Sequence, residues 1–211
     1  MSAAERKPPR STNITKSELR KFYLSKRRAL EPRQVAAMSS AIADRFFAEI
    51  DLSGLRNVHT FIRIPKLNEI DTSAIYFRIW RDWPSAKTLA PRMAVRSGEL
   101  ESVEFDDSTQ MIVNDWGISE PVGEAIADPK SIDVVLLPLL CFDEFGNRVG
   151  YGKGFYDRFL ARCRPNCMKV GLSLFPPAAL IDGINENDVP LDICVTPERS
   201  YRFGQGADRI N

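Results

Sequence analysis

Two spacings of apolar residues alternate along the chain. In segments 15–30 and 32–50 apolar residues recur every three or four positions, which is typical of helices with one buried face. Segment 134–140 is instead an unbroken apolar run, which indicates a strand buried on both faces. Segment 99–105 alternates apolar and charged residues and predicts an antiparallel edge strand. Helical and strand segments in alternation predict an α/β domain.

The starts of the predicted helices carry recognisable signals. Thr15 and Glu18 form the T-x-x-E capping box, and Pro32 suits the first turn of the second helix. Asp71 or Thr72 is expected to cap the start of a third helix. The remaining predicted strands cover residues 58–64, 87–94, 168–175 and 193–196.

Both ends of the chain are expected to lie outside this domain. Residues 1–14 are polar and contain two adjacent prolines, so we interpret them as a flexible leader. Residues 15–198 are predicted to form a single domain, which is an ordinary length for one. Residues 199–211 are interpreted as a loose C-terminal tail.

Composition restricts the classes of function. The chain has 44% hydrophobic and 27% charged residues and a net charge of +1, so no overall field favours nucleic acid or membrane. Basic residues do cluster in the first 33 positions, for which a solvated helix face is a commoner explanation than an RNA-binding arm. The single histidine, His59, argues against a histidine-based triad or metal cluster. Four cysteines without a CxxC pair, and no long apolar run, lead us to expect a reduced cytoplasmic protein.

The candidate chemistry is concentrated in one glycine-rich loop after the buried strand. Its glycines are Gly146, Gly150, Gly152 and Gly154. Glycines let an anion approach the backbone closely, and the helix predicted to follow offers free N–H groups. Arg148 and Lys153 add positive charge, and Asp157 suits a magnesium ion. The spacing matches neither the Walker A nor the dinucleotide-binding motif, so a phosphate site and an ordinary glycine-rich turn both remain open.

Isolated residues elsewhere are weaker candidates. Lys16 lies in the first turn of the first helix, where a lysine opposes the helix dipole unless it serves an anion. Glu69 follows a predicted strand, where open α/β sheets place ligands, and Asp188 lies in an acidic loop that suits magnesium. Trp116 lies in a turn-rich loop and could stack on a flat ligand. Each has an ordinary alternative, either a solvated charge or a tryptophan that covers the core.

Taken together, these segments resemble the 5-formyltetrahydrofolate cyclo-ligase family, also called methenyltetrahydrofolate synthetase. The family pattern is a proline-ended strand, a Phe-Asp pair and G-x-R-φ-G-x-G-x-G-[YF]-Y-D, where φ is apolar. Here it is formed by Pro138, Phe142-Asp143, Gly146, Arg148, Val149, Gly150, Gly152, Gly154, Phe155, Tyr156 and Asp157. Supporting segments occur in the family's order at Lys16 and Arg20, Glu69–Thr72, Pro91-Arg92, Trp116–Pro121 and Asn185–Asp188. The chain departs from the pattern at Leu139, where glycine is usual, and at Phe155, where tyrosine is common.

The resemblance implies a fold and a reaction. The expected fold is a single α/β domain with an open, mixed, mainly parallel sheet flanked by helices and an N-terminal helical segment. In the expected reaction, 5-formyltetrahydrofolate and ATP, with Mg²⁺, give 5,10-methenyltetrahydrofolate, ADP and phosphate. The formyl oxygen attacks the γ-phosphate, and ring closure then expels phosphate. The implied partners are small molecules only, a reduced folate and ATP, and we expect a monomer.

The resemblance also implies roles for individual residues. Arg148 and Lys153 are expected to be catalytic, and Asp157 and Asp188 to hold magnesium. The expected ATP-binding residues are Lys16, Arg20, Arg148, Gly150, Tyr151, Gly152, Lys153, Gly154, Phe155 and Tyr156. The expected folate-binding residues are Ile64, Glu69, Arg92, Trp116, Tyr151, Phe155 and Tyr156.

Three rival functions remain open on the sequence. A different ATP-dependent phosphotransferase would turn over ATP regardless of reduced folate. A non-catalytic relative would bind folate or nucleotide without turnover. An RNA-binding protein would use the basic N-terminal region, with an affinity that falls with salt and on changing Lys26, Arg27 and Arg28.

Overall fold

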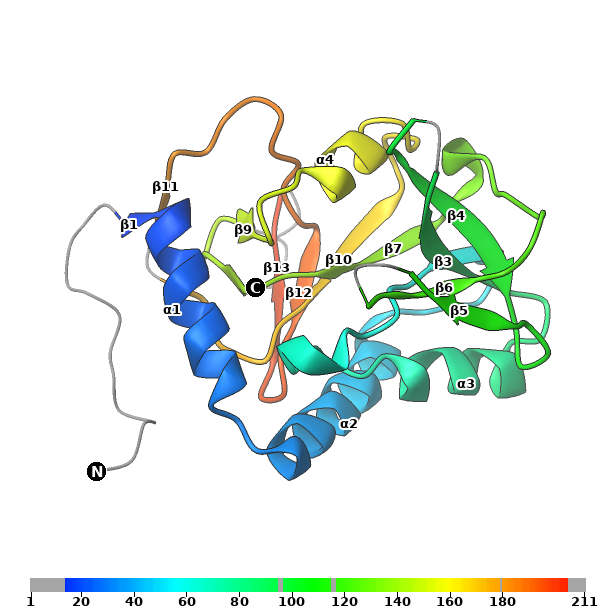
Figure 1. Cartoon of the computed structure of the whole chain (residues 1–211), viewed down its shortest axis with the longest axis horizontal. Helices are drawn as coiled ribbons and strands as arrows, with labels where there is room; N and C mark the ends of the chain where they lie inside the picture. The colour runs from blue at the N-terminus through cyan, green and yellow to red at the C-terminus, as the bar shows by residue number, and fades with distance from the viewer. Residues whose placement is uncertain (1–13, 95–96, 115–116, 179, 205–211) are drawn as a thin grey trace, which may run out of the picture.

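A seven-stranded sheet in the order β13-β12-β10-β7-β2-β3-β4 forms the centre of the computed structural model, which describes residues 14–94, 97–114, 117–178 and 180–204 (Figure 1). The inner strands run parallel, and β13 and β4 pair antiparallel at the two edges. The strands are β2 Asn57–His59, β3 Lys87–Met93, β4 Leu100–Phe105, β7 Val134–Pro138, β10 Met168–Leu172, β12 Ile193–Val195 and β13 Ser200–Arg202. The predicted mixed, mainly parallel sheet is confirmed.

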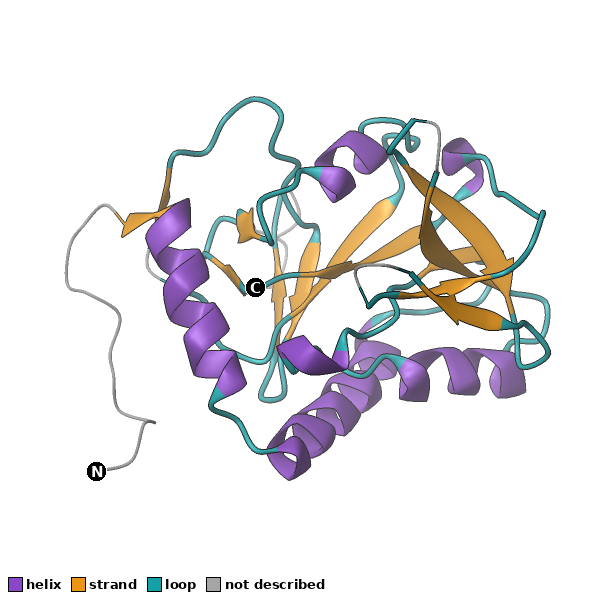
Figure 2. Cartoon of the chain, viewed as in Figure 1, coloured by secondary structure: helices purple, strands orange, loops and turns teal. Residues whose placement is uncertain are grey.

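Helices cover both faces of this sheet (Figure 2). They are α1 Lys16–Arg28, α2 Pro32–Glu49, α3 Ser73–Asp82 and α4 Phe155–Leu160, with 3₁₀ turns η2 Pro65–Leu67 and η3 Pro129–Ser131. Alternate residues of β7 show how the faces are divided. Val134 and Leu136 join the core formed with α1, α2 and α3, whereas Val135 and Leu137 join the core that contains Phe159 of α4. The unbroken apolar run of β7 is thus explained by burial on both faces.

Three short strand pairs complete the fold. They are β1 Ile14–Thr15 with β11 Ile181–Asp182, β5 Met111–Val113 with β6 Ser119–Pro121, and β8 Cys141–Phe142 with β9 Arg148–Val149. The β8–β9 pair follows β7 closely: Gly146 lies in the turn between its two strands, and Gly150, Gly152 and Gly154 follow β9. The β1–β11 pair joins the start of α1 to the chain beyond β10.

The helix starts follow their sequence signals. Glu18 N donates to Thr15 Oγ1 at 3.3 Å, and Thr15 N donates to Glu18 Oε2 at 3.0 Å, so the predicted capping box forms. Pro32 is the first residue of α2. Thr72 precedes α3 as predicted, but its hydroxyl donates to the Phe61 carbonyl at 2.5 Å instead of capping the helix. None of the described helices is long and apolar enough to cross a membrane.

Several of the predicted boundaries are wrong. The chain after Glu198 is not a loose tail, because Ser200–Arg202 pairs with β12 and places Tyr201 opposite Cys194. The predicted strand 58–64 has its ladder only as far as His59, because the chain then bends into η2. Ile14 belongs to β1 instead of the leader, and the rest of the leader, like residues 205–211, lies outside the described part of the chain.

The connections of the sheet reverse direction between β2 and β7. From β2 the chain passes through α3 to β3 on one side, whereas β7 lies on the other side of β2. The segments that follow β2 and β7 therefore diverge at the carboxyl edge of the sheet. Open α/β sheets bind ligands at such a point.

Candidate active site

The segments that follow β2 and β7 meet at Glu69. The Tyr151 hydroxyl, from the glycine loop, donates to Glu69 Oε1, and the Ile64 amide donates to Glu69 Oε2 at 2.7 Å. Glu69 is only 4% exposed, and this burial raises its pKa, against the effect of the two hydrogen bonds and of Arg27. The structure thus joins three residues expected to bind folate, and it does so at the reversal point of the sheet.

The glycine loop is shaped by backbone conformations that favour glycine. Gly152 and Gly154 have φ values of 87° and 65°, in the left-handed region. Arg20, from α1, lies against this loop: its Nε donates to the Gly150 carbonyl at 2.9 Å. A Cβ atom at Gly152 would lie 3.0 Å from both Cζ and Nε of Arg20. The missing side chain therefore makes room for this arginine.

Lys153 and the start of α4 offer less to a bound anion than the sequence suggests. The helix has six residues, so its dipole is small, and Gly154 precedes it without a side-chain cap. Lys153 is exposed, and the ion pairs of the described residues do not include it. Its catalytic role stays a prediction that requires the side chain to turn toward a ligand.

Two ion pairs bring together the residues expected to bind phosphate and magnesium. Arg148 Nη2 donates to Asp157 Oδ1 at 2.6 Å, and Lys16 Nζ donates to Asp188 Oδ2. The pairs are adjacent, because the Val189 amide lies 3.3 Å from Asp157 Oδ1 and the Val189 carbonyl accepts from Arg148. Burial opposes ionisation of Asp188, but hydrogen bonds from Lys16 and a backbone amide keep its pKa below the ordinary value.

The two aspartates fit a magnesium ion that is shared with phosphate. Their side chains are 29% exposed for Asp157 and 25% for Asp188, so both can be reached. Mg²⁺ typically takes one or two carboxylates besides phosphate oxygens and waters. The described residues contain no group of three or more His, Cys, Asp or Glu suited to a metal. This donor set therefore suits an ion that arrives with a nucleotide better than an ion held by protein alone.

Tyr156 has an unpaired polar atom that lies near both Glu69 and Arg148. Its hydroxyl is buried and has no hydrogen-bond partner. Burial and the nearby Glu69 raise the pKa of Tyr156, against the effect of Arg148, so the hydroxyl lies within the influence of both charges. Buried hydroxyls normally have a partner, which here is consistent with a ligand. The neighbouring Phe155 is partly buried, and the Arg158 guanidinium lies 5.3 Å from its ring centroid.

One expected folate-binding residue is engaged elsewhere, and another lies outside the described residues. Arg92 Nη2 pairs with Glu101 Oε2 at 3.0 Å, and its Nη1 donates to the Gly123 carbonyl at 2.6 Å, so its guanidinium is engaged beside β4. Trp116 lies outside the described residues.

Arg27 is a site residue that the sequence interpretation missed. The sequence groups it with exposed basic residues of the N-terminal region, yet it is 4% exposed and donates to the Tyr151 hydroxyl. The available signal was its spacing, because Lys16, Arg20 and Arg27 follow one another at intervals of four and seven on one helix face. The burial of Arg27 also weakens the RNA-binding alternative, which counted it as an exposed charge.

His59, the single histidine, lies in the core. It is fully buried in β2, and its Nδ1 lies 2.7 Å from the Ser102 hydroxyl. Burial lowers the pKa of His59 to about 3, so its ring is neutral near pH 7.

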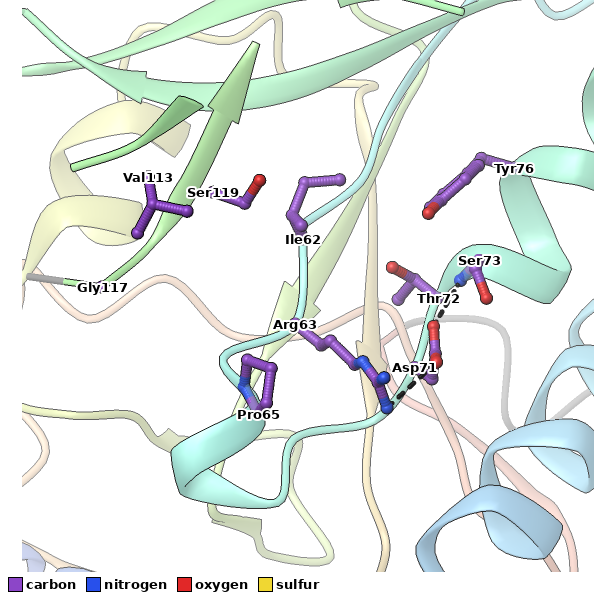
Figure 3. Close-up of a pocket in the computed structure, with 10 residues that line it drawn as sticks. All are labelled: Ile62, Arg63, Pro65, Asp71, Thr72, Ser73, Tyr76, Val113, Gly117 and Ser119. Atoms are coloured by element: carbon purple, nitrogen blue, oxygen red, sulfur yellow. Dashed lines mark hydrogen bonds and ion pairs between the residues drawn. The ribbon is translucent and has the colours of Figure 1, made fainter. Parts of the chain in front are cut away.

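A pocket of about 470 Å³ opens beside the segment that carries Ile64 (Figure 3). Its walls come from residues 62–65, the start of α3 and the β5–β6 hairpin. Arg63 and Asp71 both line it and form an ion pair, with Nη1 and Oδ2 3.1 Å apart (Figure 3). The volume lies within the usual range for a small-molecule pocket.

Comparison with known proteins identifies the family. The sequence model of the 5-formyltetrahydrofolate cyclo-ligase family matches residues 12–197. A probable 5-formyltetrahydrofolate cyclo-ligase of Schizosaccharomyces pombe is 26% identical, over 90% of this chain and 98% of its own length. The 5-formyltetrahydrofolate cyclo-ligase of Escherichia coli is 27% identical, over 84% and 98% respectively.

A solved structure supports the same assignment. The 5,10-methenyltetrahydrofolate synthetase of Aquifex aeolicus has a TM-score of 0.73 and 25% identity, and the match covers 94% of this chain and 97% of that one. The family match covers most of the sequence, including both segments that meet at Glu69. The chain belongs to the 5-formyltetrahydrofolate cyclo-ligase family.

Proposed function

We propose that this protein converts 5-formyltetrahydrofolate to 5,10-methenyltetrahydrofolate with hydrolysis of ATP to ADP and phosphate. The observation that carries the proposal is the contact between Tyr151 and Glu69. It joins the glycine loop, which suits phosphate, to a buried carboxylate, which suits the N–H groups of a pterin. A phosphoryl transfer from ATP to a folate requires these two binding regions to be adjacent.

On the folate side, Glu69 supplies acceptors for the pterin. An ionised carboxylate has about four acceptor positions, and Ile64 and Tyr151 use two of them. The remaining positions suit the N3–H and 2-amino donors of a pterin. The buried Tyr156 hydroxyl provides a further polar contact. The pocket beside Ile64 offers space for the part of folate beyond the pterin.

On the nucleotide side, the two ion pairs provide charges of both signs. Arg148 and Lys16, together with Arg20, suit the phosphates, whereas Asp157 and Asp188 suit the accompanying Mg²⁺. We infer that nucleotide binding exchanges partners, so that each cation leaves its aspartate for a phosphate. Mg²⁺ in such sites neutralises charge on the phosphate oxygens. After the exchange the basic side chains pair with phosphates and both aspartates pair with Mg²⁺, so neither aspartate is left without a positive partner.

The reaction needs positioning and charge stabilisation but no protein nucleophile. The formyl oxygen attacks the γ-phosphorus, the bond to the bridging oxygen of ADP breaks, and a phosphorylated formyl group forms. N10 of the folate then attacks the formyl carbon, loses its proton, and the oxygen departs as phosphate. Phosphoryl transfer relies on orientation and on cations near the transferred group, which Arg148 and Lys153 are expected to provide.

The test is a direct assay. Purified protein is mixed with 5-formyltetrahydrofolate, ATP and Mg²⁺, and the near-ultraviolet absorbance of the methenyl product is followed while each component is omitted in turn. The proposal expects product only in the complete mixture. ATP turnover that is indifferent to folate would indicate another phosphotransferase, and binding of folate without turnover would indicate a non-catalytic relative.

A further inference from the structure

Arg27 is a buried cation without an adjacent carboxylate. Its guanidinium donates to the Tyr151 hydroxyl and, at 3.5 Å, to the Leu139 carbonyl, and its carbon Cζ lies 5.4 Å from the Tyr151 ring centroid. Among the ion pairs of the described residues, none includes Arg27, and its Nε has no hydrogen-bond partner. A buried charge in this state is costly unless an opposite charge lies nearby. The Glu69 carboxylate is linked to Arg27 through one hydroxyl, that of Tyr151.

Tyr151 connects this cation to Glu69. A phenol has one proton, so the Tyr151 hydroxyl accepts from Arg27 and donates to Glu69 Oε1. The three groups therefore form a directed chain in which the arginine polarises the hydroxyl toward the carboxylate. This hydrogen-bond chain links three parts of the fold: α1, the glycine loop and the turn after β2.

A second contact fixes the same turn to the same helix. Asn68 directly precedes Glu69 and has a φ of 49°, a left-handed conformation that asparagine tolerates better than most residues. Its Nδ2 donates to the carbonyls of Arg27 at 3.1 Å and Leu30 at 3.0 Å, at the end of α1. The backbone that carries Glu69 is thus held by the helix that supplies the cation.

We propose that Arg27 and Tyr151 are positioning residues of the folate site, which keep the Glu69 carboxylate ionised and oriented toward the N–H donors of the pterin. The inference rests on the proposed function, because it gives Glu69 a folate to bind. It adds a role for Arg27 that the glycine-loop pattern does not contain.

The physical need for such a device follows from burial. Glu69 is 4% exposed, and burial raises its pKa, which favours the neutral acid. A neutral carboxyl group uses one oxygen as a donor and can no longer accept from two pterin N–H groups. The groups that face Glu69 are the Tyr151 hydroxyl, the Ile64 amide, the Arg27 cation and, from α4, the Tyr156 hydroxyl. Only Arg27 among them carries a positive charge, so its loss must raise the pKa of Glu69 further.

The experiment compares four variants with the wild type: Arg27→Met, Arg27→Lys, Tyr151→Phe and Arg28→Met. Arg28 is the matched control, because it is the next residue of α1 and is exposed. Equilibrium binding of 5-formyltetrahydrofolate is titrated at several pH values, and binding of ATP with Mg²⁺ is measured on the same samples. Thermal melts identify any variant that does not fold.

We expect Arg27→Met and Tyr151→Phe to weaken folate binding by about tenfold or more, as for other hydrogen bonds to buried charged groups. In Arg27→Met the affinity for ATP should stay within about twofold of the wild type, a change too small to indicate a lost contact. On acidification, Arg27→Met should begin to lose folate affinity at a higher pH than the wild type. The reason is that the Glu69 carboxylate takes up a proton more readily without the nearby positive charge. Arg27→Lys should recover part of this shift, and Arg28→Met should match the wild type.

The inference is overturned if Arg27→Met weakens folate and ATP binding equally, or lowers folate affinity by the same factor at every pH. If Arg27→Met does not fold, Tyr151→Phe decides, because it removes one hydroxyl and leaves the buried arginine in place. Wild-type folate affinity in Tyr151→Phe would then refute the proposed hydrogen-bond chain. A wild type that binds folate but makes no product would refute the proposed reaction alone, since the binding comparison among variants still stands. A wild type that binds no folate would overturn both.

Discussion

Gly152→Ala tests the shape of the glycine loop. Gly152 has a φ of 87°, and a Cβ atom there would lie 3.0 Å from Cζ and Nε of Arg20. An L-residue in left-handed backbone is destabilised by about 1–2 kcal/mol. For a chain of this length, that corresponds to a melting temperature lower by about 2–8 °C. The contact with Arg20 adds little to this, because the guanidinium is partly exposed and can move away.

The displaced arginine should nevertheless affect nucleotide binding. If Arg20 moves, its Nε no longer donates to the Gly150 carbonyl, a bond of 2.9 Å that holds it against the loop. We expect the KM for ATP to rise by about tenfold, equivalent to about 1.4 kcal/mol, and the KM for folate to change much less. Steady-state kinetics with each substrate varied in turn, alongside thermal melts, measure both effects.

Gly150→Ala is the matched control for stability. The φ of Gly150 is not in the left-handed region, and no atom would lie within 4 Å of a Cβ atom there. A glycine replaced by alanine at a compatible position stabilises a fold by up to about 1 kcal/mol. The two neighbouring changes should therefore shift the melting temperature in opposite directions. If Gly152→Ala melts like the wild type and keeps its ATP KM, the loop does not have this conformation.

Three further predictions concern residues around the site. Arg92→Met should leave the folate KM within about twofold, because its guanidinium pairs with Glu101; a tenfold rise in kinetic assays would return Arg92 to the folate site. Burial lowers the pKa of His59 to about 3 from an ordinary 6.5, so on acidification only the unfolded chain takes up this proton. In urea unfolding, the free energy of unfolding should then fall by about 1.4 kcal/mol for each pH unit of acidification between about pH 6 and pH 3. This contribution should be missing in His59→Gln. A chain that ends after Glu198 lacks β13, which leaves β12 as an open edge. It should melt at a lower temperature and, because open edges favour aggregation, scatter more light. An unchanged melting temperature would mean that β13 contributes nothing to stability.

Features that depend on neighbouring residues were predictable. The capping box at Thr15, the helix start at Pro32 and the buried strand β7 all follow from patterns within a few positions of one another. The glycine loop also belongs to this class, because its glycines and charged residues are contiguous. Local hydrogen bonding and periodic burial were sufficient to identify them.

Features that depend on distant pairing were not predictable. Ser200–Arg202 contains two polar residues and becomes a strand only because β12 offers an open edge. Glu69 and Tyr151 lie 82 positions apart, and their contact depends on the reversal of connections between β2 and β7. Arg27 looks like a surface charge until the loop that covers it is in place. The sequence thus indicated candidate residues, but not the pairs that the structure forms among them.

The distribution of the site along the chain has a consequence for synthesis. Lys16 and its partner Asp188 are 172 positions apart, and Arg20 rests on a carbonyl 130 positions later. Helix α1 therefore leaves the ribosome long before these partners, and its cations stay unmatched until residue 188 has been translated. A prematurely terminated product would display those bare charges and an apolar helix face, which makes it a natural target for chaperones and proteases.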